Sequence, residues 1–438
     1  MLYHNRKLYS ALVTIATLTA SIIIYQVYLI QFNNELYYSA DEAPVILWWT
    51  PFGNEGKHRE CGNYRCYFTS NRTFQYHRKI SALLFYGSSF QIDDLPEWKS
   101  DGVPWGLIHE ESPRNNPILV QQEALNLFTY SSTFSRFSDV PLTLVDLPGI
   151  TELLGREYFV PTNEKTKLMH TKNLAPLLYI QSDCDTASNR DVYVTELMKY
   201  IRVDSYGACL NNAEFDKRLK ENYLEALNRE DFLSFAGNYK FTIAFENAVC
   251  HDYITEKLWR PLIVGSVPIY YGSPSFKDWL PNDMSAISVL DFKDPRTLAN
   301  FLLDLSRNET EYDKYLSHKL VDNYEIANRR LKETLERKQS WFRNGFGNYV
   351  DEFECLVCED VQKANKREIK IVDRRHYDCP LPKNPLTNET DHDNWWTKKW
   401  LLEKCGAKLL AHYLKNNLTI NRDKFENDKI NLHNEKKC

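Results

Sequence analysis

The stretch from Tyr239 to Gly272 reads YKFTIAFENAVCHDYITEKLWRPLIVGSVPIYYG. It begins with an apolar run at 239–245 and ends with another at 266–272, and each run is typical of a buried β-strand. Between them lies a polar segment, ENAVCHDYITEK, which leads into a helix-like segment. The stretch therefore predicts a strand, a helix and a second strand, as in a parallel α/β sheet.

Apolar runs of the same kind recur on the N-terminal side of this stretch. They are VILWW (45–49), ISALLFYG (80–87), WGLIH (105–109), LTLV (142–145) and LAPLLYI (174–180). Helix-like segments such as 191–201 lie between strands. This alternation, in two series separated by the polar segment 150–172, predicts two α/β domains. We expect the ligand cleft where the C-terminal ends of the strands lie.

The composition is that of an ordinary globular protein. The chain has 438 residues, of which 43% are hydrophobic and 26% are charged, and this length suffices for two domains. The formal net charge of −5 argues against a nucleic-acid-binding protein, which would carry a basic face.

The N-terminal segment is the strongest indication of a compartment. Arg6 and Lys7 precede a long apolar run, and no charged residue follows them until Glu35. The run exceeds the roughly 20 residues that a membrane-spanning helix needs. Because the basic residues lie on its N-terminal side, we expect a cytosolic tail at 1–7 and a signal anchor at 8–32, with the remainder luminal.

A cleaved signal peptide is the alternative, with a cut near Ala20 or Ala40. Its apolar core would exceed the usual length of about 7–15 residues, which favours the uncleaved anchor. We therefore expect a single-pass type II protein of the endoplasmic reticulum or Golgi membrane, which contacts the bilayer through this helix. Four N-x-[ST] sequons agree with luminal exposure: Asn71, Asn308, Asn388 and Asn417.

The ten cysteines agree with an oxidising compartment, where an even number indicates disulfides. Cys61 and Cys66 lie early in the chain, whereas Cys355 and Cys358 lie late. We expect two bridges among these four that tie the ends of the chain together. The alternative is a zinc site built from the two pairs.

Glu246 and Asn247 follow the predicted strand 239–245, at the end where α/β proteins place ligand-binding groups. Asp252 is predicted to cap the next helix, whose first N–H groups would then point toward the same place. A helix start binds anions, and Lys257 adds a full positive charge. The pattern favours a phosphate or diphosphate ligand. The structural alternative is a simple cap at Asp252 and a surface pair between Glu256 and Arg260.

A second candidate site is GLIHEESPRN (106–115), where a predicted strand runs into Glu110 and Glu111. Adjacent carboxylates at a strand end face opposite ways, so only one need enter the cleft. A carboxylate in that place suits a general base that takes a proton from a hydroxyl group. The alternative is a solvated loop.

A third candidate is QSDCDTASNRDVYVTEL (181–197), in which Arg190 lies in the first turn of a predicted helix and could pair with a phosphate. Asp183 and Asp185 form a DxD pattern, which some sugar-nucleotide enzymes use to hold manganese, and Asp391 and Asp393 form another. Such short patterns arise often by chance, so neither supports a metal site.

The stretch FENAVCHDYITEKLWRPLIVGSVPIYYG closely resembles the donor-binding motif of the α1,3-fucosyltransferases, glycosyltransferase family 10. More than a dozen positions agree in order and spacing. HEESPRN resembles the ESP motif of the family, and SDCDTASNR resembles its arginine segment. The resemblance extends from about residue 44 to 350, and it is nearest to the animal branch numbered ten and eleven.

The resemblance implies a GT-B architecture, which consists of two facing Rossmann-like α/β domains with a cleft between them. A stem at 33–43 would precede an N-terminal acceptor and base domain at 44–160. A GDP-fucose-binding domain at 161–349 would follow, and then a cysteine-containing tail at 350–438.

The resemblance also implies the roles of individual residues. Glu111 would be the catalytic base on the acceptor hydroxyl. GDP-fucose would be bound by Arg190 and Lys257 at its diphosphate, by Asn247, Tyr253 and Glu256 at its phosphates, ribose or fucose, and by Glu246 near the fucose. The family is metal-independent, so no metal cofactor is expected.

The resemblance implies an inverting transfer of L-fucose from GDP-fucose to a luminal glycoprotein or folded protein domain. The acceptor group would be a Ser or Thr hydroxyl or the 3-hydroxyl of N-acetylglucosamine. The choice between these two acceptors stays open. The segment LFTYSSTFSRFSDV (127–140), which the resemblance implies would face the acceptor, departs from the pattern of relatives that act on lactosamine. A catalytically inactive glycan- or glycoprotein-binding module with the same fold is one alternative, and a glycosidase with two catalytic carboxylates is another.

Overall fold

The computed structural model describes residues 21, 43–51, 56–96, 102–215, 219, 229–343, 348–363 and 371–438. The predicted signal anchor at 8–32 therefore lies outside the described residues except for Ser21, and so does the cytosolic tail at 1–7. Within the described ranges, no helix combines the length and the apolar character that crossing a bilayer requires.

The chain divides into two compact units. The smaller unit consists of residues 1–84, 100–104 and 355–367, and the larger unit consists of residues 85–99, 105–354 and 368–438. The domain boundaries predicted above, at 44–160 and 161–349, remain a prediction.

Four strands of the smaller unit lie in the order β2-β3-β1-β4. Their bounds are Val45–Thr50 for β1, Lys57–Cys61 for β2, Tyr64–Thr69 for β3 and Ile80–Tyr86 for β4. β2 and β3 form an antiparallel hairpin, in whose turn Gly62 has a φ of 60° that favours glycine, and β1 runs parallel to β3. The sheet is therefore mixed, and the strands predicted at 45–49 and 80–87 are confirmed.

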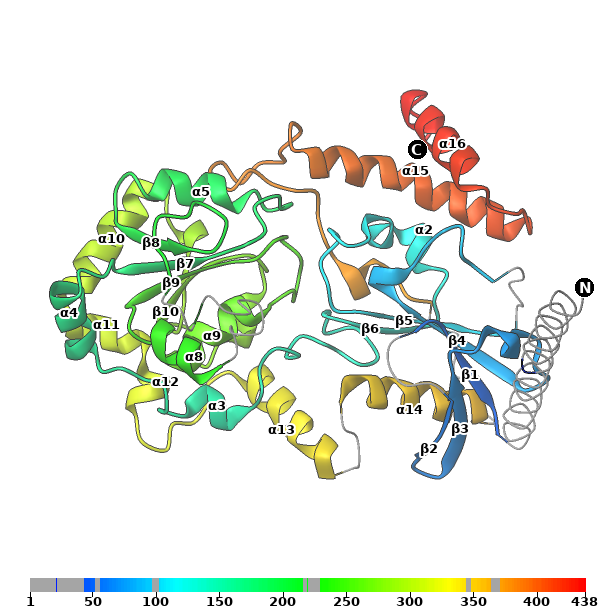
Figure 1. Cartoon of the computed structure of the whole chain (residues 1–438), viewed down its shortest axis with the longest axis horizontal. Coiled ribbons are helices and arrows are strands. Elements are labelled where there is room, and N and C mark those ends of the chain that lie inside the picture. The colour runs from blue at the N-terminus through cyan, green and yellow to red at the C-terminus, as the bar shows by residue number, and fades with distance from the viewer. Residues whose placement is uncertain are drawn as a thin grey trace, which may run out of the picture. The chain divides into compact units, whose positions relative to one another are not determined.

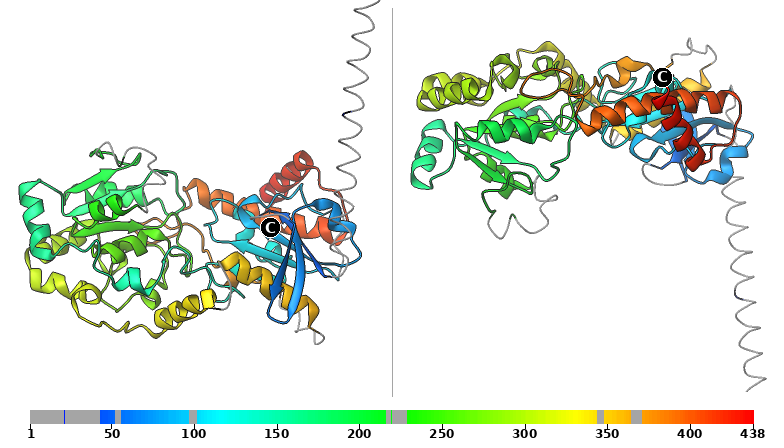
Figure 2. Two further views of the ribbon diagram at one scale, coloured as in Figure 1. Left: turned by 60° about the horizontal axis from the view of Figure 1, so that its bottom comes forward. Right: turned by 90° about the horizontal axis from the view of Figure 1, so that it is seen from above.

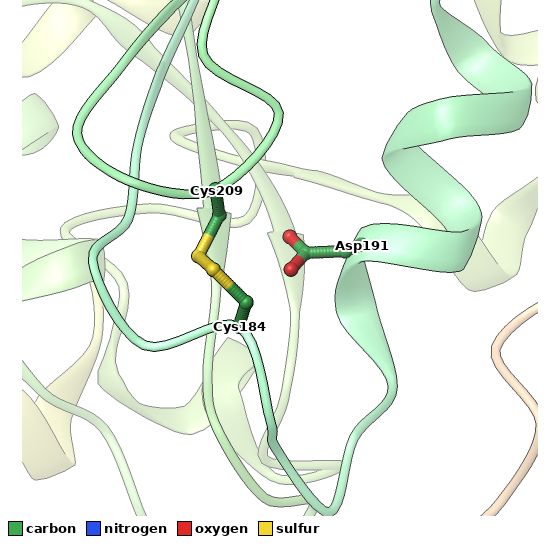
Figure 3. A group of neighbouring side chains, drawn as sticks. All are labelled: Cys184, Asp191 and Cys209. Atoms are coloured by element: carbon green, nitrogen blue, oxygen red, sulfur yellow. A yellow bond between two sulfur atoms is a disulfide. The ribbon is translucent and has the colours of Figure 1, made fainter.

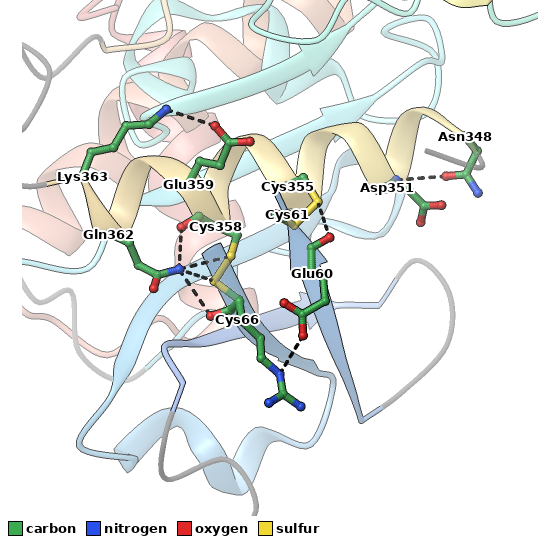
Figure 4. The surroundings of a disulfide bond; sticks show 11 residues. Glu60, Cys61, Cys66, Asn348, Asp351, Cys355, Cys358, Glu359, Gln362 and Lys363 are labelled. Carbon is green, nitrogen blue, oxygen red and sulfur yellow. Dashed lines mark hydrogen bonds and ion pairs between the residues drawn. A yellow bond between two sulfur atoms is a disulfide. The ribbon is translucent and has the colours of Figure 1, made fainter. Parts of the chain in front are cut away.

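Two disulfide bonds join this hairpin to α14 (Tyr349–Gln362), as Figure 4 shows. Cys61 is bonded to Cys355, and Cys66 is bonded to Cys358. The prediction that these four cysteines form two bridges is confirmed. The zinc alternative is wrong, because none of the four sulfur atoms is a free thiol.

The larger unit contains a five-stranded sheet in the order β11-β10-β9-β7-β8 (Figure 1). The bounds are Leu177–Ile180 for β7, Val203–Tyr206 for β8, Phe241–Phe245 for β9, Val267–Tyr271 for β10 and Ile287–Ser288 for β11. Every neighbouring pair is parallel. The strands predicted at 174–180, 239–245 and 266–272 are confirmed, as is the parallel α/β arrangement.

Helices cover both faces of this sheet, which explains why its inner strands β7, β9 and β10 are mostly apolar. Phe241, Ile243 and Phe245 pack with α5 (Arg190–Leu197) and α10 (Pro295–Arg307), while Ala244 packs with α8 (Glu230–Ala236) and α9 (Glu256–Val264). α5 confirms the helix predicted around 191–201. Further α-helices in the described residues before the tail are α3 (Ile150–Leu154), α4 (Thr162–Thr171), α11 (Glu309–Tyr315), α12 (Ser317–Leu320) and α13 (Arg329–Arg343). Short 3-10 helices there include η2 (Arg72–Tyr76), η3 (Gly87–Ser89), η5 (Phe276–Trp279) and η6 (Val289–Asp291).

The larger unit also contains β5 (Trp105–His109) and β6 (Tyr130–Thr133), which pair in parallel. η4 (Pro117–Val120) and α2 (Gln122–Leu125) lie between them in the chain. The strand predicted at 105–109 is confirmed. The strand predicted at 142–145 is wrong, because the backbone there forms turns in which the N–H of Val145 donates to the carbonyl of Leu142.

The tail predicted at 350–438 is largely helical where it is described. η7 (Arg374–Tyr377) precedes α15 (Trp395–Lys415) and α16 (Arg422–Asn434), and Figure 2 shows these last two helices, in orange and red, packed against each other. A disulfide joins Cys405, in the middle of α15, to Cys438, which follows α16. Of the four sequon asparagines, Asn308, Asn388 and Asn417 are exposed and Asn71 is half-buried, and their glycosylation remains a prediction.

Candidate active site

Glu246 follows β9 and is fully buried. Its Oε1 accepts a hydrogen bond of 2.8 Å from the N–H of Thr255, and its Oε2 accepts one of 2.7 Å from the Thr255 hydroxyl. Lys257 Nζ lies 3.8 Å from Oε2. Burial raises the pKa of Glu246 to about 7, although Lys257 opposes the rise. Glu246 thus joins the end of β9 to the start of α9.

Gly272, which follows β10, explains the end of the opening stretch. The N–H of Glu246 donates to the carbonyl of Tyr271, so the two strand ends lie side by side. A Cβ atom at position 272 would lie 2.5 Å from Cγ of Glu246. Only glycine leaves room there for the buried carboxylate.

The prediction that Asp252 caps α9 is wrong, because the N-cap is Thr255, whose hydroxyl accepts from the N–H of Lys257. Asp252 has a φ of 63° and is buried, and it accepts hydrogen bonds from Arg136 Nε at 2.7 Å and from the Trp279 indole at 2.9 Å. These bonds outweigh the effect of burial and lower the pKa of Asp252. Asp252 therefore holds the loop after β6 against the stretch Tyr239–Gly272, here called the donor stretch.

The first N–H groups of α9 are not free, contrary to expectation. Glu246 accepts from the N–H of Thr255, and Asp146 accepts from the N–H of Glu256 at 3.1 Å. Protein carboxylates thus satisfy the start of the helix. An anion at this place would rely on side-chain cations instead.

A pocket of about 210 Å³ opens beside this helix. Four of the predicted donor-binding residues line it: Arg190, Asn247, Glu256 and Lys257. Its apolar wall is made by Leu178, Ile180, Phe232, Ala236 and Pro261, and its other lining residues include Gln181, Asp183 and Arg260. Glu246 and Tyr253 are buried and are not among the lining residues.

Two polar atoms of the pocket lining are buried without a hydrogen-bond partner in the described structure, namely Arg190 Nε and Asn247 Oδ1. The remaining guanidinium nitrogens of Arg190 are engaged, since Nη1 donates to the carbonyl of Phe245 at 2.9 Å and Nη2 to that of Asp183 at 2.8 Å. Buried polar atoms are rarely left unpaired. The pocket therefore offers one donor and one acceptor to a polar ligand.

The charges on α9 stabilise one another inside this pocket. Lys257 Nζ lies 3.0 Å from Glu256 Oε1, and Arg260 Nη1 lies 3.7 Å from the same oxygen. Burial opposes ionisation of Glu256, but Lys257 and Arg260 outweigh it and lower its pKa to about 2. Burial likewise opposes the charge on Lys257, but Glu256 and Glu246 raise its pKa. Lys257 therefore stays charged at neutral pH.

The two carboxylates after β5 have different surroundings, as predicted. Glu110 accepts a hydrogen bond of 2.9 Å from the hydroxyl of Tyr86. Within the described residues, the carboxylate of Glu111 has no hydrogen-bond or ion-pair partner. Burial raises the pKa of Glu111, as do Glu110, Glu256 and Asp146, while Lys257 lowers it. Glu111 is therefore the carboxylate that shares its surroundings with the start of α9.

Sequence reasoning missed two residues of this site. Asp146 holds the start of α9, and Tyr377 from the tail donates a hydrogen bond of 2.6 Å to the backbone carbonyl of Glu111. The apolar residues before Asp146 suggested a strand and hid its role. The cysteine near Tyr377 was a signal, because Cys379 is bonded to Cys250 in the donor stretch, but the pairing could not be deduced from spacing.

The two DxD patterns are explained by structural contacts. Asp183 forms an ion pair of 2.9 Å with Arg114, and Asp185 accepts from the Trp396 indole at 2.9 Å. Figure 3 shows Asp191 beside Cys184 and Cys209, whose sulfur atoms are bonded to each other. Sulfur atoms in a disulfide are not thiolate ligands. Asp391 accepts N–H groups of Asp393 and Asn394 in a local turn.

Family models match most of the chain. The model described as "Glycosyltransferase family 10 (fucosyltransferase) C-term" matches residues 169–375, and the model described as "Fucosyltransferase, N-terminal" matches residues 41–144. The first match contains the pocket, and the second contains the ESP motif.

Curated relatives with high identity carry the name GDP-fucose protein O-fucosyltransferase 3. The protein from Gallus gallus is 41% identical over 415 residues, which cover 90% of this chain and 86% of the relative. The protein from Homo sapiens is 45% identical over 361 residues, which cover 80% and 74% respectively. A crystal structure of an alpha1,3-fucosyltransferase with GDP-fucose aligns at a TM-score of 0.40 and 17% identity, covering 64% of this chain and 81% of that chain.

Proposed function

The chain belongs to the fucosyltransferases of glycosyltransferase family 10 and is a GDP-fucose-dependent glycosyltransferase, and we propose that it transfers L-fucose to a Ser or Thr hydroxyl of a folded luminal protein. The observation that carries the choice of acceptor is the similarity to GDP-fucose protein O-fucosyltransferase 3 along most of the chain. The alternative of an inactive binding module loses support, because the relatives of this chain are named as transferases.

We place GDP-fucose in the pocket beside α9. Its charged side carries Lys257 and Arg260 for the diphosphate, and the unpaired Nε of Arg190 and Oδ1 of Asn247 await polar groups. The apolar wall that includes Phe232 suits the flat guanine base. Glu246 and Tyr253 act from behind the lining by fixing the shape of the donor stretch.

Glu111 is the proposed catalytic base. The acceptor oxygen forms a bond to the anomeric carbon of fucose, while the bond from that carbon to the phosphate oxygen breaks and GDP leaves with the electron pair. The acceptor proton passes to the carboxylate of Glu111. Lys257 stabilises the charge that develops on the leaving diphosphate. Attack opposite to the leaving group inverts the configuration of the sugar.

The finer fold and the location of the protein remain part of this proposal. We assign a GT-B architecture with domains at 44–160 and 161–349. We also assign a signal anchor at 8–32 in the endoplasmic reticulum or Golgi membrane, and independence from metal ions. The pairing of all ten cysteines supports an oxidising lumen.

The test is release of GDP from GDP-fucose by the full-length protein in detergent, with and without chelator. Parallel reactions contain no acceptor, a lactosamine, an N-glycan, or a folded cysteine-rich protein domain, and Glu111→Gln serves as the inactive control. We expect release only with the protein domain, and we expect the chelator to leave it unchanged. Release with an N-glycan alone would instead assign the N-acetylglucosamine hydroxyl. Tight GDP binding without release would contradict the proposal.

A further inference from the structure

The segment Val372–Cys379, here called the strap, belongs to the tail yet lies at the candidate active site. On one side it is held along β6 and the loop that follows. The Ser135 hydroxyl donates to the carbonyl of Arg375 at 2.6 Å, and the Thr133 hydroxyl donates to the carbonyl of His376. The N–H of Val372 donates to the carbonyl of Phe128 at 3.0 Å.

On its other side the strap is tied to the donor stretch. The N–H of His251 donates to the carbonyl of Asp378 at 2.9 Å, and Cys379 is bonded to Cys250. Cys250 lies three positions after Asn247, which lines the pocket. The strap is therefore fixed covalently to the stretch that holds the donor, and by hydrogen bonds to the segment expected to face the acceptor.

Tyr377 lies between these two attachments and is fully buried. Its ring stacks on His109 with centroids 5.3 Å apart, and it packs against Phe134 at 4.8 Å. Its hydroxyl donates to the backbone carbonyl of Glu111 at 2.6 Å. Burial raises the pKa of Tyr377 well above its ordinary value, so the hydroxyl remains a donor at every physiological pH.

We propose that Tyr377 is a positioning residue that holds the backbone of Glu111 so that the carboxylate points at the acceptor hydroxyl. This inference rests on the proposed role of Glu111 as base. The hydrogen bond fixes the peptide plane from which the Glu111 side chain departs. Among the residues that the structure describes, the carboxylate itself has no hydrogen-bond or ion-pair partner that would orient it, so we infer that the backbone sets its direction.

The test is Tyr377→Phe, which keeps the ring and removes the hydroxyl. Tyr312→Phe is the matched control, because Tyr312 is also fully buried and donates its hydroxyl to a backbone carbonyl, that of Lys240, among the residues packed with α10. We expect kcat of Tyr377→Phe to fall about tenfold, because small displacements of a catalytic group are costly. KM for GDP-fucose and the affinity for GDP should stay as in the unmodified protein. Tyr312→Phe should lower thermal stability to a similar degree without changing kcat.

Ser135→Ala provides a second route, because it releases the strap from the loop after β6 without altering Tyr377 or Glu111. We expect a smaller fall in kcat, again with unchanged KM for GDP-fucose. If the unmodified protein transfers fucose but Tyr377→Phe and Ser135→Ala both keep its kcat, the inference alone is overturned. If the unmodified protein transfers fucose to no acceptor, the proposed function fails and the inference falls with it.

Discussion

At the scale of single residues, two adjacent glutamates show how surroundings assign a role. Glu110 is held by the hydroxyl of Tyr86, whereas the carboxylate of Glu111 has no hydrogen-bond or ion-pair partner in the described part of the chain and shares its surroundings with Lys257. Alternation along a strand predicts that adjacent side chains diverge. It does not reveal that burial and distant carboxylates raise the pKa of Glu111, because those surroundings depend on residues far away in the sequence.

The raised pKa of Glu111 predicts the pH dependence of transfer. A general base acts in its deprotonated form, so kcat/KM should fall as the pH drops through the pKa of this group. Because burial raises that pKa, the fall should begin at a higher pH than an ordinary glutamate, near 4.5, would give. Initial rates between about pH 4 and pH 8 measure it.

Substitutions check the assignment of that titration. Glu111→Gln should lower kcat/KM by about a hundredfold or more and remove the acid limb. Glu110→Gln is the matched control and should keep the limb. An acid limb that survives in Glu111→Gln would assign the base to another group.

Gly272 leads to a second prediction at this scale. In Gly272→Ala the added carbon would meet Cγ of Glu246 at 2.5 Å, and crowding of this kind costs about 1–3 kcal/mol of unfolding free energy. The melting temperature and the affinity for GDP should both fall in Gly272→Ala. Gly149→Ala is the control, because its added carbon would meet only the flexible end of Glu152, at 3.0 Å. Equal losses in both variants would contradict the account of Gly272.

At the scale of elements, the strands that sequence predicts best are those buried on both faces. β9 and β10 are continuous apolar runs, and they lie where the runs lie. β2, with the sequence KHREC, was not predicted because it is a partly exposed edge strand whose charged residues carry no apolar signal. The apolar run at 142–145 gave a wrong strand prediction, because its two leucines lie in a turn and are nevertheless buried.

The cap of α9 shows the same limit for helices. The sequence predicted Asp252 as the cap, but long-range bonds from Arg136 and Trp279 engage Asp252, and Thr255 caps the helix instead. Of the predicted donor-binding residues, four line the pocket, and the positions of Glu246 and Tyr253 behind it depend on packing that spacing does not reveal.

Thr255→Val tests this cap. The change removes the hydroxyl that accepts from Lys257 N–H and donates to Glu246, and loss of a cap costs about 1 kcal/mol. We expect a lower melting temperature and a weaker affinity for GDP. Thr297→Val is a control, because the Thr297 hydroxyl donates to Asp294, the N-cap of α10, away from the pocket lining. The proposed link between the Thr255 cap and GDP binding is contradicted if only Thr297→Val loses affinity for GDP.

At the scale of the whole molecule, two disulfides close nearly the same loop. Cys61–Cys355 and Cys66–Cys358 join positions separated by 294 and 292 residues. In the chain-entropy account a bridge stabilises by restricting the unfolded chain, so either bridge alone supplies most of the restriction. Their contributions should therefore not add.

We expect the paired variant Cys66→Ser/Cys358→Ser to lose little unfolding free energy, and Cys61→Ser/Cys355→Ser likewise. Removal of all four cysteines should cost about 5 kcal/mol, more than the sum of the two pairs. Denaturant unfolding of the three variants measures this. Additive losses would show that each bridge acts through local contacts instead.

The bond between Cys250 and Cys379 also has a consequence for biosynthesis. The ribosome makes Cys250 129 residues before its partner, so the donor stretch must wait with an unpaired thiol while the rest of that span is synthesised. The site is complete only after the strap has arrived and oxidation has taken place. A premature stop codon between Gly272 and Tyr377 would leave every residue of the donor stretch in place and still yield a protein without Tyr377.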